Sequence, residues 1–181
     1  MKRLIEINHA GEYGMLLSDC GSYQYRVWRE WDASRPALAF LMLNPSAADE
    51  HDEDPTLTRC FACAVANDFG RLEMVNLFPL RTTSPEELLT HPDPLGPRNA
   101  ANVSILDVVD RAAMVICAWG SHKTTAARAA DVMQLLRITG MHARLFHLGL
   151  NKDGSPKHPL YIAANTQPNS FRPEIAPTRW S

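Results

Sequence analysis

Residues 37–46 read ALAFLMLNPS. Seven consecutive apolar residues are typical of a β-strand that is buried on both faces, as in a parallel sheet covered by helices. The run stops at Asn44, and Pro45 restricts the backbone directly after it. This stretch therefore predicts an α/β fold in which a central strand ends on a rigidly held amide side chain.

Three more apolar runs follow along the chain, at residues 72–78, 113–119 and 143–149. Helical patterns lie between the runs, at residues 54–70, 84–89, 96–112 and 124–140. In the first of these helices we expect Asp54 as N-cap, Pro55 at the first position and Gly70 as the stop. Strands and helices that alternate over short connections predict a three-layer α/β/α fold with a four-stranded, mainly parallel central sheet.

The two ends of the chain differ from this pattern. Residues 12–31 read as two extended segments around Asp19–Ser22, and the alternation of Tyr23, Tyr25 and Val27 with other residues indicates a half-solvated strand. We therefore expect an N-terminal antiparallel hairpin at one edge of the sheet. No second core or internal repeat is visible, so residues 1–181 are expected to form a single domain with an irregular tail from about residue 165.

Composition excludes several classes of protein. The 181 residues are 45% hydrophobic and carry a formal net charge of −2, which suits one compact domain and does not indicate a strongly basic nucleic-acid binder. The chain has no apolar run long enough for a membrane span and no signal-peptide pattern, so a cytoplasmic location without membrane partners is expected. The C-x-x-C pair Cys60 and Cys63 has no second pair, and buried thiols are expected there.

Ligands of open α/β sheets bind beyond the carboxyl ends of the strands, and polar or aromatic residues gather at all four predicted ends. They are Asn44, Pro45 and Ser46, then Asn76 and Phe78, then Trp119, Gly120, Ser121 and His122, and finally His158 and Pro159. Arg81 follows the second strand in the run Phe78-Pro79-Leu80-Arg81. The sequence therefore predicts a ligand site at this edge, with no metal and no cofactor.

Each of these residues also has a purely structural interpretation. Asn44 and Ser46 can form a turn, because their side chains hydrogen-bond nearby backbone. His122 and His158 can be surface histidines. Asn76 lies inside an apolar strand, where an amide needs partners to offset a desolvation cost of about 1–3 kcal/mol. The acidic run from Asp49 to Asp54 is typical of a solvated loop with a helix cap, although clustered carboxylates also bind hard cations.

Six motifs between about residues 22 and 165 resemble a bacterial family of domains of unknown function, number 1643. They are YQYRVWREW, MLNPSAAD, DPTLTRC, VNLFPLR, AWGSH and GLNKDGSPKHPLY. The strand ends also resemble the motifs of the uracil-DNA glycosylase superfamily. LMLNPS is similar to the Asn-Pro form of the first motif, EMVNLF to the strand whose asparagine reads the base, and VICAWGSH to the Trp-Gly motif. KHPLY is similar to the final His-Pro-Ser loop but has Leu160 in place of the serine.

The second resemblance implies a protein that removes a damaged or modified base from DNA by hydrolysing the N-glycosidic bond. It implies Asn44 and His158 as catalytic residues, with Asn44 orienting a water and His158 supporting the departing base. Asn76 would pair with the flipped base, and the other strand-end residues would line the pocket. Asp49 or Asp54 would supply negative charge, and the expected DNA contacts are Lys123, Lys152, Lys157 and Arg172.

Two other functions stay open from the sequence. A non-catalytic protein that binds a nucleotide or a modified base is favoured by the neutral Asn44 and the incomplete last motif. A metal-dependent phosphoesterase would use the acids of residues 49–54. The expected partner is accordingly DNA, a nucleobase or a nucleotide.

Overall fold

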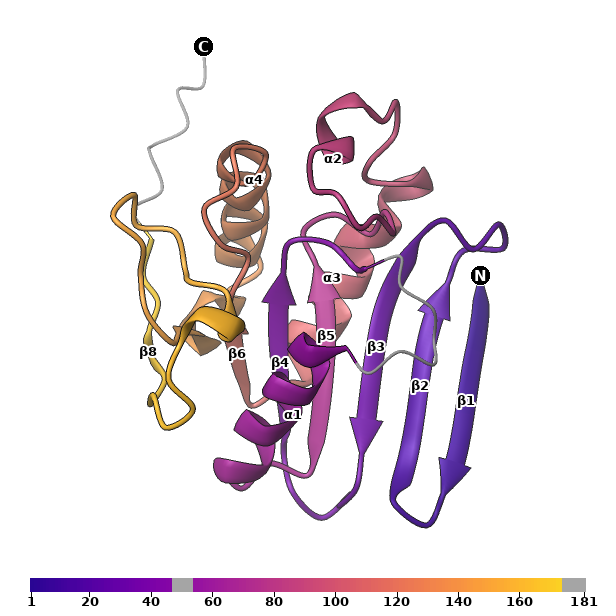
Figure 1. The fold of residues 1–181 in the computed structure, drawn as a ribbon, viewed down its shortest axis with the longest axis vertical. Helices are drawn as coiled ribbons and strands as arrows, with labels where there is room; N and C mark the ends of the chain where they lie inside the picture. Colours follow the sequence, from indigo (N-terminus) through magenta and orange to yellow (C-terminus); the bar gives the residue numbers. More distant parts are fainter. Residues whose placement is uncertain (47–53, 174–181) are drawn as a thin grey trace.

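A computed structural model describes residues 1–46 and 54–173 and shows one continuous eight-stranded sheet in the order β1-β2-β3-β5-β4-β6-β7-β8 (Figure 1). The strands are β1 (Lys2–Asn8), β2 (Gly11–Leu17), β3 (Gln24–Glu30), β4 (Ala37–Met42), β5 (Arg71–Asn76), β6 (Met114–Cys117), β7 (Leu145–His147) and β8 (Asn169–Ser170). The helices are α1 (Pro55–Ala66), α2 (Glu87–Thr90), α3 (Ala100–Arg111) and α4 (Thr125–Ile138). Three short 3₁₀ helices are η1 (Pro97–Asn99), η2 (Met141–Arg144) and η3 (Pro159–Tyr161).

The four predicted apolar runs form the parallel part of the sheet, in the order β5-β4-β6-β7. Leu38, Phe40 and Leu41 of β4 are completely buried, as expected for a strand covered on both faces. The α/β class is therefore confirmed. A four-stranded, mainly parallel sheet is wrong, because the eight strands make four antiparallel pairs and three parallel pairs.

The N-terminal hairpin also differs from its prediction in one respect. Strands β2 and β3 pair antiparallel as expected, but β3 continues the sheet through β5, and the edge position belongs to β1. All residues of β1 are exposed. The strand therefore shows no alternation of buried and exposed residues that its sequence could reveal. At the other end, Asn169–Ser170 pair with β7 and Phe171 is buried, so the segment after residue 165 is not wholly irregular.

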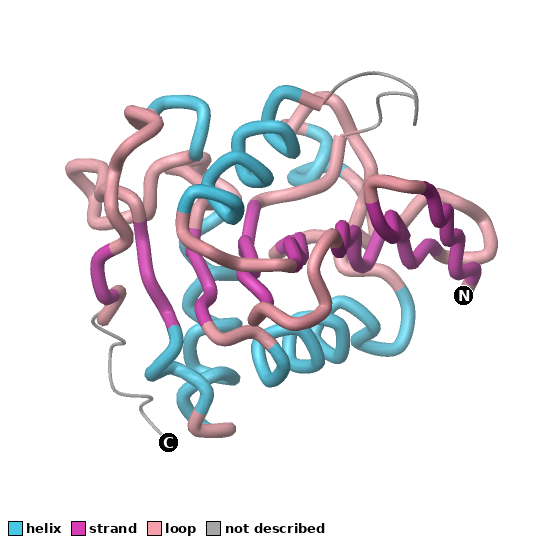
Figure 2. The backbone as a smooth tube through the Cα atoms, turned by 90° about the horizontal axis from the view of Figure 1, so that it is seen from below, coloured by secondary structure: helices cyan, strands magenta, loops and turns pink. Residues whose placement is uncertain are grey.

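Helices cover both faces of the sheet (Figure 2). On one face, Cys60 and Ala64 of α1 pack on β4 and β5, which confirms the expected burial of Cys60, whereas Cys63 is only partly buried. On the opposite face, residues of α3 and α4, including Ile105 and Leu136, complete the larger core cluster. Within the described residues, no helix is long and apolar enough to span a membrane.

The start of α1 agrees with the sequence and its end does not. Asp54 Oδ1 accepts hydrogen bonds from two backbone N–H groups of the first turn, and Pro55 occupies the first position. The helix ends at Ala66, four residues before Gly70. Gly70 is needed for close packing instead, because a Cβ there would lie 1.9 Å from the carbonyl oxygen of Asp32.

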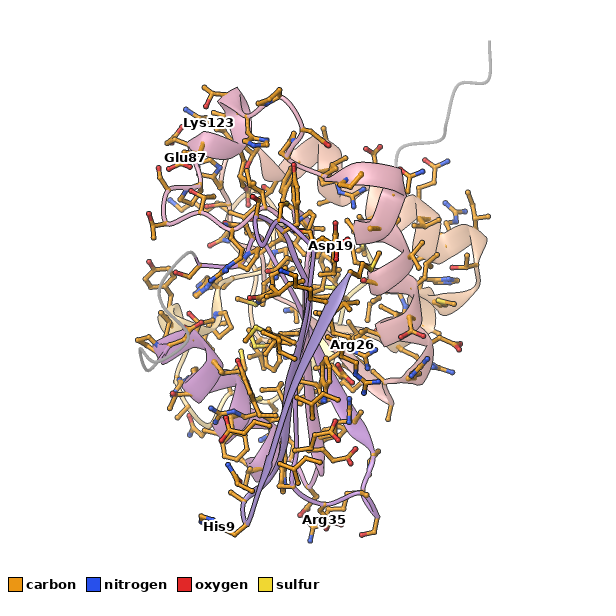
Figure 3. All side chains as sticks on the ribbon, turned by 90° about the vertical axis from the view of Figure 1, so that its right-hand side faces the viewer. His9, Asp19, Arg26, Arg35, Glu87 and Lys123 are labelled. Atoms are coloured by element: carbon orange, nitrogen blue, oxygen red, sulfur yellow. The ribbon has the colours of Figure 1, made fainter. Side chains whose placement is uncertain are left out.

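An ion-pair network fixes the antiparallel strands to α3. The Arg26 guanidinium donates to both carboxylate oxygens of Glu73, at 2.6 and 2.7 Å, and to Asp107 of α3 at 2.9 Å. Arg71 Nε donates to the same Glu73 carboxylate at 2.6 Å. Glu73 is only 3% exposed, so these arginines compensate a buried charge. Figure 3 shows Arg26 on the side of the sheet that α3 covers.

Candidate functional site

The order of the strands determines where a site can form. Strand β4 lies between β5 and β6, and the chain leaves β4 through α1 on one face but leaves β6 through α4 on the other. Neighbouring strands whose connections diverge in this way leave a crevice at their carboxyl ends, where ligands of α/β proteins bind. Asn44 follows β4 and Trp119 follows β6, so both lie at this crevice.

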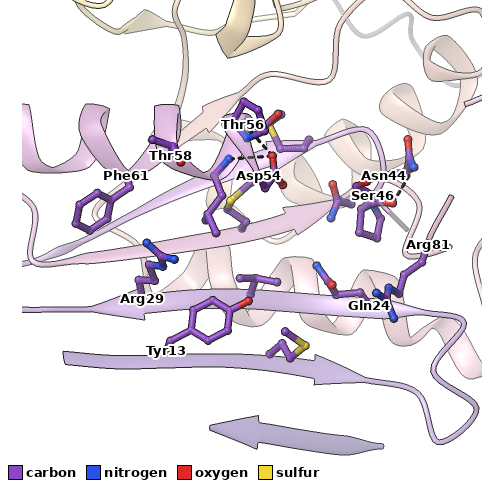
Figure 4. Close-up of a pocket in the computed structure, with 18 of the residues that line it drawn as sticks. Tyr13, Gln24, Arg29, Asn44, Ser46, Asp54, Thr56, Thr58, Phe61 and Arg81 are labelled. Carbon is purple, nitrogen blue, oxygen red and sulfur yellow. Dashed lines mark hydrogen bonds between the residues drawn. The ribbon is translucent and has the colours of Figure 1, made fainter. Parts of the chain in front are cut away.

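A cavity of about 880 Å³ extends from this crevice between the beginning of α1 and strands β2 and β3 (Figure 4). Met15, Val27 and Met74 from the sheet contribute apolar surface to its lining. Six of the predicted site residues line it, namely Asn44, Pro45, Ser46, Asn76, Trp119 and His158. The structure thus brings together residues from three strand ends and from the segment before η3.

Asn44 is held by backbone groups. Its Nδ2 donates to the carbonyl oxygens of Pro45 and Thr82, both at 3.0 Å, and Thr82 N donates to the Pro45 oxygen at 3.1 Å. These bonds tie the loop after β4 to the loop after β5. The Oδ1 atom of Asn44 has no hydrogen-bond donor among the described residues and can accept one from a ligand or a water.

Asn76 is the most unusual polar residue of the cavity. It is 8% exposed, and no hydrogen bond of its side chain is formed within residues 1–46 and 54–173. Its amide atoms are not among the described polar atoms that are completely buried without a partner, so they remain open to the cavity. Because the residue lines the cavity, its donor and acceptor are available to whatever fills that space.

His158 and Asp54 add a hydrogen-bond donor and a carboxylate to the same cavity. Burial lowers the pKa of His158, and the charge of Asp54 partly opposes this shift. The Nδ1 atom of the neutral ring accepts from Leu160 N at 3.4 Å, which leaves the proton on Nε2. Asp54 caps α1 through Oδ1, while its Oδ2 forms no hydrogen bond to another described residue.

Several further polar residues of the cavity escaped the sequence analysis as site residues, among them Arg81 and Gln24. Arg81 comes from the loop after β5, and Gln24 begins β3. The Nε atom of Arg81 is buried and has no hydrogen-bond partner among the residues that the structure describes. The position of Arg81 just beyond a strand end was a usable signal, whereas nothing in the local sequence of Gln24 indicated its place.

The other predicted binding residues lie outside the cavity lining. They are Phe78, Gly120, Ser121, His122 and Pro159. Phe78 is buried in the core, and Pro159 lines a separate cavity of about 170 Å³. The His122 ring contacts Thr124 Oγ1 at 2.7 Å and Glu86 Oε1 at 3.2 Å, so it fixes the turn before α4.

The predicted nucleic-acid contacts are not part of the cavity wall. None of Lys123, Lys152, Lys157 and Arg172 lines it. Lys123 forms an ion pair with Glu86 at 2.9 Å, and Arg172 donates to the backbone of His142 at 3.1 Å. The charged residues that line the cavity are Glu6, Glu12, Glu30, Asp54, Arg29 and Arg81. Carboxylates therefore outnumber guanidinium groups in the described wall.

The acidic run is described only at Asp54, and residues 49–53 lie outside the described part. Among the residues that the structure describes, no group of three or more His, Cys, Asp or Glu side chains is arranged to hold a metal ion. The expectations for Asp49 and for a phosphoesterase site depend on residues beyond this part of the chain.

Comparison with known proteins identifies the family of the chain. No curated protein matches the chain. The model of a family described as "Protein of unknown function (DUF1643)" matches residues 24–160, a range that begins at β3 and ends within η3. It includes every described residue of the loops after β4, β5 and β6. The chain belongs to the DUF1643 family.

Proposed function

We propose that the cavity binds the base of a nucleotide and that the chain is a glycosylase-like hydrolase of the N-glycosidic bond of a damaged or modified base. The observation that carries this proposal is the Asn76 amide, which belongs to a residue only 8% exposed, lines the cavity and has no hydrogen-bond partner among the described residues. An amide offers one donor edge and one acceptor edge, which is the pattern that a base edge complements.

The remaining residues suit the charges of this reaction. The bond between C1′ and the base nitrogen breaks with its electron pair on the base, leaving a cationic sugar. His158 Nε2–H donates to the departing base anion, and the Asp54 carboxylate stabilises the sugar cation. A water that donates a hydrogen bond to Asn44 Oδ1 adds to C1′. The proton that this water loses neutralises the base anion.

A second candidate is a protein that binds the base without hydrolysis. It is favoured by Asn44, whose Nδ2 is committed to two backbone carbonyls and whose amide carries no charge. Asn44 then has a structural role in closing the loop, and the cavity retains Asn76 as its recognition group.

The test is single-turnover base release. Oligonucleotides with uracil, hypoxanthine, xanthine, alkylated or hydroxymethylated bases, and the matching nucleoside monophosphates, are incubated with the wild type. The Asn76→Ala and His158→Ala variants are compared, with His142→Ala as control because that histidine is exposed and does not line the cavity. We expect release to fall by about 100-fold in both cavity variants and to be unchanged in the control.

The outcomes separate the candidates. Binding that is lost in Asn76→Ala, without release from any substrate, supports the binding protein. Release that survives both cavity substitutions contradicts the proposed site.

A further inference from the structure

Arg81 is a cation in the cavity wall that no described residue neutralises. Within the described part of the chain, its Nε atom is buried without a hydrogen-bond partner, and its Nη1 atom donates only to the Gly21 carbonyl oxygen, at 3.4 Å. It forms no ion pair with any described residue. Arg26 and Arg71 in contrast form close ion pairs with Glu73, both at 2.6 Å.

A partly buried guanidinium that is not paired is unfavourable, because its N–H groups lose water without gaining acceptors. Native structures retain such groups mainly where a ligand, an ion or a water supplies the acceptor. The planar fork of arginine matches the oxygen atoms of a phosphate in pairs. The surroundings of Arg81 therefore point to an anion from outside the chain.

The backbone places Gln24 next to Arg81. Arg81 N donates to Ser22 O at 3.0 Å, Gln24 N donates to Pro79 O at 2.8 Å, and Tyr23 and Leu80 form an antiparallel bridge. Both side chains line the cavity and lie at the same end of it in Figure 4. The Gln24 amide forms no hydrogen bond to another described residue, so it offers a second donor beside the guanidinium.

Arg29 is the other cation of the cavity wall and is bound differently. Its guanidinium lies over the rings of Tyr13 and Phe61, at 5.4 and 5.8 Å from their centres, and the residue is exposed. Stacking between two rings gives Arg29 a role without a ligand. Arg81 has no such partner.

We propose that Arg81, assisted by Gln24, binds a phosphate group of the ligand whose base contacts Asn76. The ligand is then a nucleotide, free or within a DNA strand, and not a free base or a nucleoside. The assignment of the base rests on the proposed function, whereas the anion site rests on Arg81 itself.

The experiment is calorimetric titration of the full chain. The probes are inorganic phosphate, a panel of nucleosides, their 5′-monophosphates and short single-stranded oligonucleotides. The variants are Arg81→Gln, Arg81→Lys and, as control, Arg35→Gln, because Arg35 pairs with Asp32 and Asp68 and does not line the cavity. Thermal unfolding of each variant verifies that it is folded.

We expect one monophosphate to bind about tenfold or more tightly than its nucleoside. This preference should fall to about twofold in Arg81→Gln, be partly kept in Arg81→Lys and persist in Arg35→Gln. Oligonucleotide binding that depends on Arg81, without binding of free monophosphates, also supports the phosphate site and assigns it to a DNA strand.

Other results would overturn one proposal without the other. Equal binding of nucleoside and monophosphate by the wild type overturns the phosphate site and leaves base recognition intact. Phosphate binding that requires Arg81 but shows no dependence on any base supports the anion site and contradicts the proposed function. If no phosphate-bearing probe binds, the role of Arg81 is overturned.

Discussion

At the residue scale, Asn76 makes opposite predictions for stability and for function. Replacing it with leucine removes a largely desolvated amide that has no partner among the described residues, and it introduces an apolar side chain of similar size. We expect Asn76→Leu to raise the free energy of unfolding by about 1 kcal/mol, measured by urea denaturation, and to abolish ligand binding or base release.

Asn102 provides the matched control. Its Oδ1 accepts from Arg128 Nη2 at 2.6 Å, so Asn102→Leu leaves a buried guanidinium without that acceptor. This variant should lose about 1–2 kcal/mol of stability. A loss of stability in Asn76→Leu of the same size would show that Asn76 has a structural partner after all.

Two histidines make the stability depend on pH. Burial lowers the pKa of both His158 and His147, so their neutral forms are favoured in the folded chain. A histidine in the unfolded chain titrates near pH 6.5, where it begins to bind protons that the folded chain does not. Their contribution to stability is therefore complete above about pH 6.5 and is lost as the pH falls through the lowered pKa values.

This dependence of stability on pH can be measured by chemical denaturation between about pH 5 and pH 8. The range includes the ordinary histidine pKa of about 6.5. We expect His158→Gln and His147→Gln each to reduce the loss of stability on acidification. His142→Gln, at an exposed position, serves as control. An unchanged acid dependence in the double variant would refute the assignment.

At the scale of elements, the network around Glu73 should determine how firmly the antiparallel strands are attached. Glu73→Gln removes the charge that both Arg26 and Arg71 require, at a position that is 3% exposed. Removing one partner of a buried ion pair costs about 3–5 kcal/mol, and we expect a loss at the lower end of this range in urea denaturation.

The comparison for this prediction is Asp68→Asn, which breaks an ion pair with Arg35 where the aspartate side chain is 91% exposed. Exposed pairs contribute little, so its stability should change by less than about 0.5 kcal/mol. Similar effects of the two substitutions would mean that solvent reaches Glu73.

Elements with a strong local pattern were predictable, and those defined by pairing alone were not. The parallel strands are continuous apolar runs, and α1 begins at a recognisable cap. Within the helical pattern of residues 96–112, residue type does not show which side faces the core, because Val103 is 62% exposed while Ser104 and Ile105 are buried. The exposed strand β1 joins the sheet through its pairing with β2, which its amino acids do not reveal.

At the scale of the whole molecule, the candidate site is a boundary between two parts of the sheet. The strand-end rule identified the side that belongs to the parallel strands, from Asn44 to Trp119. It could not identify the opposite wall, because Gln24 and Arg29 come from β3, an antiparallel strand whose position beside β5 depends on long-range pairing. The site is thus complete only when β3 is paired with β5.

This arrangement predicts how hydrogen exchange varies across the sheet. Opening free energies follow burial and contacts, so the amides of the exposed β1 should exchange about 100-fold faster than those of the buried residues 38–42 of β4.

A ligand that contacts both Asn76 and Gln24 stabilises only states in which β3 and β5 stay paired. Hydrogen exchange with mass spectrometry should therefore show slower exchange of β3 amides when a binding nucleotide is added. Amides at the solvent-exposed end of α4, which contributes no residue to the cavity lining, should exchange by local opening at an unchanged rate. Protection that increases in α4 but not in β3 would place the ligand elsewhere, because β3 contributes residues to the cavity lining and α4 contributes none.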